Sequence, residues 1–106
     1  MVRRTAMTLD DFKASLERDA PPEGLDNALQ ALWHDAKGGW DTAHRHAQAQ
    51  RDADGAWVHA YLHRVEGDRD NADYWYRRAG KPHSSASLRD EWDEIAAALL
   101  SRTAAG

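Results

Sequence analysis

The residues best placed to do chemistry lie in the stretch HAYLHRVEG, residues 59–67, in which His63 follows His59 by four positions and Glu66 comes three positions later. Two imidazoles at i and i+4 share one side of a helix and can chelate one metal ion. His34 or Glu66 is the candidate third ligand. The HExxH motif of metalloproteases is absent, because the residue after His59 is Ala60. The spacing therefore suggests a metal-binding protein without a general base beside its ligands.

The same histidines also fit the polar side of an amphipathic helix. With Trp57 as zero, the apolar residues of this helix span about 140°, whereas His59, His63 and Glu66 lie between about 180° and 240°. We therefore expect them to face away from the core. The helix that begins near residue 25 is also amphipathic, with its polar residues opposite its leucines. If the two helices are neighbours, one polar patch results, made of Asn27, Gln30, His34, Lys37, His59, His63 and Glu66.

Three interpretations of this patch remain open: a solvated surface, a binding face for a protein or peptide, and a metal site. Inner helices of helical repeats commonly bind peptide segments, which favours the second as a function. The metal site ranks below it, because the sequence shows no carboxylate that would orient the imidazole rings. The preferred function is thus a small non-catalytic protein-binding or scaffold module with an unknown protein or peptide partner.

Tyr74 is a further candidate binding residue. On its helix it falls well away from the apolar face formed by Ala72, Trp75, Tyr76 and Ala79. Large aromatic side chains on the surface are enriched at protein interfaces. We therefore expect Tyr74 to lie in a homodimer interface or in another partner surface.

Other chemistry finds little support in the chain. There is no cysteine, so disulfides, thiolate metal sites and thiol nucleophiles are excluded. The serines near His83 lie in a linker without a GxSxG elbow. The cations Arg77, Arg78 and Lys81 fit the last turn of a helix, and a net charge of -4 argues against nucleic acid as a partner. The sequence thus predicts no catalytic residues, no cofactor and no enzyme activity.

Length and composition predict one domain, residues 1–106, with a single core. The segment MVRRTAMTLDDF contains no apolar stretch of the kind found in signal peptides. No run of residues is long and apolar enough to cross a membrane. These features favour a cytoplasmic location and no membrane contact.

Apolar periodicity predicts an all-α fold with five or six short helices. The expected units are an N-terminal helix over 8–20, a first hairpin over 25–50, a second hairpin over 56–80 and a C-terminal helix over 87–102. Thr8 and Ser87 have the spacing of helix caps, with an acid three positions later. The polar segment RDADG, residues 51–55, is expected to form the turn between the hairpins.

The two hairpins show signs of a repeat. A shift of 29 positions places His34 on His63 and Gly38 on Gly67, with Ala43 on Ala72. Two copies of one helical hairpin would produce this correspondence. The second copy, AYLHRVEGDRDNADYWYRRAG, resembles a Sel1-type or tetratricopeptide hairpin, in which a glycine-acid turn precedes a small residue and a WY-R-A ending.

The resemblance covers residues 25–82 and extends to short bacterial helical proteins. It implies that the small packing positions correspond to Ala60, Ala72 and Ala79, and the turn glycine to Gly67. It also implies a pair of antiparallel hairpins packed side by side. Because two copies are fewer than a self-supporting array needs, the terminal helices are expected to cap the pair.

Overall fold

The computed structural model describes residues 7–105, and their side chains as far as Arg102. The first six residues, part of the segment considered for a signal peptide, lie outside the described residues. The fold is all-α, as predicted, and the described residues contain no strand. None of the helices within residues 7–105 has the length and apolar character needed to span a bilayer. The elements are α1 (Leu9–Ala14), the 3-10 helix η1 (Ser15–Glu17), α2 (Asn27–Ala36), α3 (Trp40–Ala49), α4 (Ala53–Val65), α5 (Arg69–Ala79) and α6 (Leu88–Ala105).

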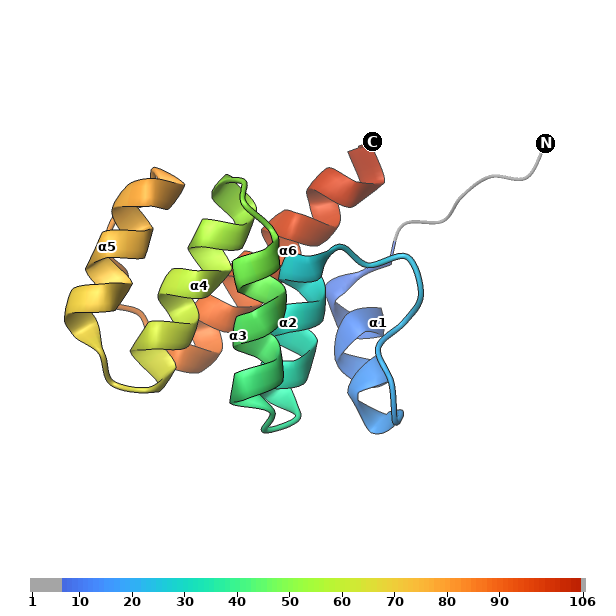
Figure 1. The fold of residues 1–106 in the computed structure, drawn as a ribbon. Coiled ribbons are helices and arrows are strands. Elements are labelled where there is room, and N and C mark those ends of the chain that lie inside the picture. Colours follow the sequence, from blue (N-terminus) through green and yellow to red (C-terminus); the bar gives the residue numbers. More distant parts are fainter. Residues whose placement is uncertain (1–6, 106) are drawn as a thin grey trace.

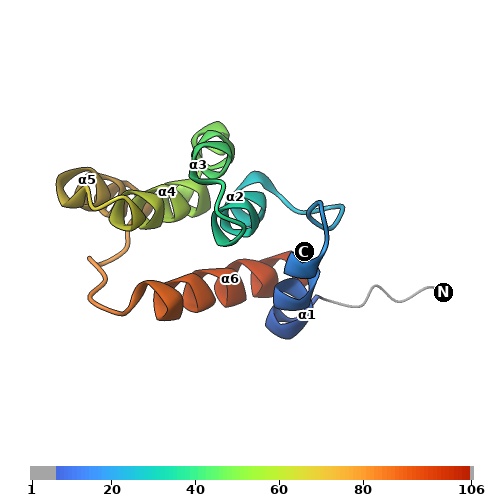
Figure 2. The same cartoon turned by 90° about the horizontal axis from the view of Figure 1, so that it is seen from below.

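The helices form two layers, and α4 lies at the centre. Figure 1 shows α2 beside α3, and α4 beside α5, each pair joined by a short turn. Figure 2 shows α6 running lengthwise beneath this layer, with α1 next to its C-terminal end. From the sequence, the terminal helices were expected to close the ends of the hairpin pair. Instead α6 covers one side, where it packs against α2 and α4.

Aromatic side chains pack α6 against α1 and connect it to α2. Phe12 of α1 stacks on Trp92 of α6, with ring centroids 5.5 Å apart. The Trp92 indole N–H donates to the carbonyl oxygen of Leu32 at 3.0 Å, so α6 is also bonded to α2. Both rings are buried and the Trp92 indole N–H is satisfied, so this large side chain occupies a small core without an unpaired donor.

The turns inside the two hairpins have the same backbone geometry. Gly38 and Gly67 adopt φ values of 84° and 85°, in the left-handed region that favours glycine. In each turn the residue after the glycine donates its N–H, at 2.8 Å, to the carbonyl oxygen of the histidine four positions before the glycine. This is the Schellman arrangement. The shift of 29 positions thus matches the hydrogen-bonded residues of the first turn with those of the second turn.

The RDADG segment differs from the expectation of a turn, because α4 already begins at Ala53. Asp52 caps the helix by accepting a hydrogen bond from the N–H of Gly55 at 2.9 Å. A Cβ atom on Gly55 would lie 1.8 Å from the carbonyl oxygen of Gln50. Gly55 is therefore needed for a close backbone approach in the first turn of the helix, and it does not interrupt the helix.

The expectation that His59 and His63 face solvent was wrong. Their exposed fractions are 3% and 8%, and every residue of α4 from Gly55 to His63 is buried. The physical reason is the central position of α4, which packs against α2, α3, α5 and α6. A helix with neighbours on so many sides has no solvent face, so its polar side chains point into the space between helices.

A buried ion pair fixes α6 to the second hairpin. Glu91 is 1% exposed and accepts hydrogen bonds from Arg64 Nη1 and from the Tyr76 hydroxyl, both at 2.5 Å. Burial and the nearby Glu91 carboxylate raise the pKa of Tyr76, so its hydroxyl stays protonated and donates. Glu91 lies in the first turn of α6 and was not among the candidate residues predicted from the sequence. In the fold it ties α4, α5 and α6 together.

Candidate metal centre

Three imidazoles from two helices meet between α3 and α4. His44 of α3 approaches His59 of α4 with 2.9 Å between their Nε2 atoms. His63 lies one turn further along α4, and one ligand nitrogen from each ring falls within 4.8 Å of the others. We call His44, His59 and His63 the histidine trio. Their convergence requires α3 and α4 to pack closely, which the small residues Ala43 and Ala47 permit.

Two indoles hold the trio in place. Trp40 precedes His44 by one helical turn and stacks on it, with centroids 4.9 Å apart. The Trp40 indole N–H also donates to the carbonyl oxygen of Leu62 at 2.8 Å, which bonds α3 to α4. On the other side, Trp75 of α5 stacks on His59 with centroids 3.8 Å apart and an interplanar angle of 15°. The rings of the trio are therefore ordered by packing before any ligand is bound.

Glu66 orients the third imidazole. Its Oε1 lies 2.5 Å from Nδ1 of His63. Because a carboxylate has only acceptors, Nδ1 is the protonated nitrogen, and Nε2 of His63 is left as the potential ligand. A carboxylate bonded to the second nitrogen is the usual partner of a metal-binding histidine. The expectation that no carboxylate orients the rings was therefore wrong, and Glu66 holds the role of orienting group in place of third ligand.

The local electrostatics favour neutral imidazoles. Burial, followed by the nearby His44 and His63, lowers the pKa of His59 to about 4. Burial is also the main cause of the lowered pKa of His44, to which His63 contributes. A neutral imidazole has a lone pair to share, and metal binding requires this form. At neutral pH His44 and His59 are thus in the state that binds metal ions.

The spacing of the trio is close to that of a metal site. Three nitrogens at about 2.0–2.1 Å from a tetrahedral zinc ion are separated from one another by about 3.4 Å. The closest pair here is 2.9 Å apart and all three nitrogens are within 4.8 Å. Binding of zinc would require the nitrogens of His44 and His59 to move slightly apart and to exchange their shared hydrogen bond for bonds to the ion. Three nitrogen ligands leave a fourth position for water or another small ligand.

His34, the other candidate ligand, lies elsewhere. It stacks on His46 with centroids 5.3 Å apart and an interplanar angle of 2°. His46 in turn shares a hydrogen bond of 2.9 Å with Asn27. Burial, followed by the nearby His46, lowers the pKa of His34. The third imidazole beside His59 and His63 is therefore His44, and the suggestion of His34 as a third ligand was wrong.

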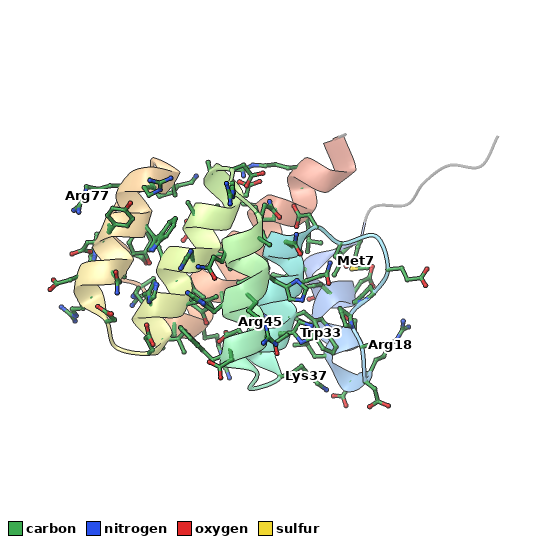
Figure 3. The ribbon with its side chains drawn as sticks, in the orientation of Figure 1. Met7, Arg18, Trp33, Lys37, Arg45 and Arg77 are labelled. Atoms are coloured by element: carbon green, nitrogen blue, oxygen red, sulfur yellow. The ribbon has the colours of Figure 1, made fainter. Side chains whose placement is uncertain are left out.

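The remaining residues of the expected polar patch are bonded to the chain that leads into α2. Gln30 donates to the carbonyl oxygen of Leu25 at 2.9 Å. Lys37 reaches the carbonyl oxygens of Leu16 and Arg18 at 2.7 and 3.1 Å, as its position near Arg18 in Figure 3 illustrates. The polar row of α2 thus anchors the segment after α1, and it is separate from the buried histidines of α4.

Tyr74 is exposed, as expected, with 45% of its surface accessible. Its hydroxyl accepts a hydrogen bond from Arg78 at 3.2 Å. An interface at Tyr74 stays a prediction.

His44, the first histidine of HRH at residues 44–46, was not among the residues that the sequence predicted as ligands. A signal was present. On a helical wheel His44 lies about 40° from Trp40, the largest residue of the apolar stripe of that helix. A histidine this close to an inward-facing indole is expected to be partly covered, whereas His46 lies on another side.

A second group of potential ligands overlaps the trio at His63 and includes Glu66 and Asp68. Asp68, however, caps α5 by accepting from the N–H and the side chain of Asn71 at 3.2 and 2.7 Å. Those hydrogen bonds lower the pKa of Asp68 and occupy its oxygens. The trio is the better candidate, because its nitrogens are shielded and have no competing role in capping.

Comparison of the chain with protein-family models, curated proteins and solved structures finds no match. The case for the site therefore depends on its geometry.

Proposed function

We propose that this protein binds a divalent transition-metal ion, with zinc as the best fit, through His44, His59 and His63. The observation that carries this proposal is the convergence of three ligand nitrogens within 4.8 Å between α3 and α4. Imidazole nitrogen suits zinc, copper and nickel, whereas magnesium and calcium prefer oxygen. The role of Glu66 as an orienting carboxylate supports the same conclusion.

The fold around the trio supports metal binding over the protein-binding face that the sequence favoured. That face needed His59 and His63 on the surface, yet both are covered by neighbouring helices. We propose a binding or scaffold protein without catalysis of its own, in which the ion sits between the two hairpins. The matching turns support a Sel1-like or tetratricopeptide-like repeat as the origin of the two halves.

Zinc titration of the metal-free protein, followed by calorimetry, tests the proposal. We expect one ion per chain and a melting temperature that rises with zinc concentration, because a ligand that binds only the native state stabilises it. His44→Ala should abolish both effects. His46→Ala is the matched control, since it lies on the same helix but outside the trio. Wild-type protein that binds no zinc at micromolar concentration would end the proposal.

A conservative variant shows which of the two overlapping groups of potential ligands binds the ion: the histidine trio, or His63 with Glu66 and Asp68. Asp68→Asn removes a ligand charge but keeps a good helix cap. If the trio binds the ion, zinc affinity should be unchanged in Asp68→Asn. Binding that survives in His44→Ala and disappears in Asp68→Asn would assign the site to His63, Glu66 and Asp68.

Protein binding remains a second candidate function, favoured by one observation: the exposed Tyr74 ring lies against the Arg78 guanidinium, 5.7 Å from the ring centroid. Such aromatic and arginine pairs are enriched at interfaces. We propose that a second copy or another protein contacts this surface. Sedimentation of the wild type and of Tyr74→Ser at high concentration tests the homodimer, and a strict monomer in both would exclude it.

A further inference from the structure

A hollow lies directly beside His59 of the histidine trio. One helical turn from His44 on α3 is Ala47, and one turn from His59 on α4 is Ala56. Both alanines are buried. Their methyl groups are too small to fill the volume that the imidazoles of His44 and His59 fill one helical turn away. A cavity of about 370 Å³ results, and His59 and both alanines line it. His59 is thus a wall of the cavity and a member of the trio.

Two cationic side chains line this cavity. Arg78 follows Trp75 by one turn on α5, lines the cavity and holds its guanidinium carbon 5.3 Å from the Trp75 ring centroid. Arg51 also lines it, and is exposed with no ion-pair partner among the described residues. The one acid among the described lining residues is Asp52, whose carboxylate is already bonded to the N–H of Gly55 and to Gln50. The cavity therefore has an excess of positive charge.

We infer that this cavity binds a small carboxylate, of which one oxygen takes the open position on the metal ion and the other pairs with Arg78. The inference rests on the proposed metal site. Carboxylate oxygen is a common zinc ligand, and a guanidinium matches a carboxylate through parallel hydrogen bonds. Arg78 Nη1 donates to the Tyr74 hydroxyl at 3.2 Å, and its side chain lines the same cavity as His59, so a ligand bound beside His59 can reach the guanidinium. The volume is at the small end for ligand pockets, which suits a small organic acid.

The cobalt-loaded full-length protein provides the test, because cobalt(II) can replace zinc and its visible spectrum reports its ligands. Cobalt uptake is measured first. Acetate is then added at constant ionic strength in perchlorate, with the visible absorption as the readout. We expect a saturable spectral change. Arg78→Met should weaken acetate binding by about tenfold, as the loss of a charge-assisted hydrogen bond implies.

Arg77→Met is the matched control, because Arg77 is adjacent in sequence yet points away from the body of the protein (Figure 3). It should bind acetate like the wild type. A protein that takes up no cobalt refutes the proposed metal site itself. A cobalt-loaded protein whose spectrum does not respond to acetate refutes the carboxylate site and leaves the metal site intact. Equal acetate affinity in the wild type and in Arg78→Met refutes the role of Arg78.

Discussion

The contact between Glu66 and His63 allows a quantitative prediction for Glu66→Gln. The glutamine keeps the size of the side chain but removes the charge that fixes Nδ1 of His63 as the protonated nitrogen. Loss of such an orienting partner lowers metal affinity by about 10–100-fold, or about 1.4–2.7 kcal/mol. Because 37% of the Glu66 side chain is exposed and water can replace part of the hydrogen bond, we expect a value near tenfold.

The effect on stability follows from the same numbers. At a free zinc concentration of 100 times the wild-type Kd, binding stabilises the native state by about 2.7 kcal/mol. A tenfold weaker Kd in Glu66→Gln reduces this to about 1.4 kcal/mol at the same zinc concentration. The zinc-dependent part of the difference should disappear when a chelator removes the metal, and the part that stays measures the effect of the substitution on the metal-free fold.

Zinc calorimetry and urea unfolding, each with and without chelator, measure the two quantities. Glu94→Gln serves as the control, since Glu94 is an exposed residue of α6 away from the trio. Affinity of Glu66→Gln within twofold of the wild type would show that Glu66 does not orient His63. Complete loss of binding would instead make Glu66 a direct ligand, in contradiction to the trio.

Three further predictions concern the fold around the site. Tyr76→Phe leaves Glu91 Oε2 without its donor and should lower the free energy of unfolding by about 1–3 kcal/mol in urea titrations. Gly55→Ala forces a Cβ against the carbonyl oxygen of Gln50 and should cost about 1–3 kcal/mol in the same assay. Burial raises the pKa of Asp35 in the native state above 3.8, so the native state holds more protons than the unfolded chain above this pH. Stability should therefore fall as pH rises through this window, and unfolding curves of Asp35→Asn between pH 3 and pH 6 should lack this contribution.

Local signals in the sequence identified most of the helix ends. Thr8 caps α1 in a capping box with Asp11, and the Ser87 hydroxyl accepts from the N–H of Asp90 at the start of α6, both as expected. Gly38 and Gly67 end the first helices of the two hairpins. Each signal depends on side chains within a few positions of each other, and such short-range chemistry can be read from the order of residues alone.

The candidate site could not be predicted in the same way, because it depends on which helix is central. A helical wheel divides His59 and His63 from the apolar residues, but it does not show whether the polar side meets water or another helix. His44 comes from α3, and its place opposite His59 is fixed only when the two helices pack. His59 and His63 share a helix and could be identified from the sequence. His44 could not, because only tertiary packing brings it to them.

Hydrogen bonding in the trio bears on how a metal ion would act. Burial of polar groups is costly unless they are bonded. Here His44 and His59 bond each other, and Glu66 satisfies Nδ1 of His63. Among the described residues no fully buried side-chain nitrogen or oxygen lacks a partner. The metal-free protein can therefore be folded and stable, unlike small zinc domains that unfold without their ion. Zinc would then add stability to a site that is already assembled.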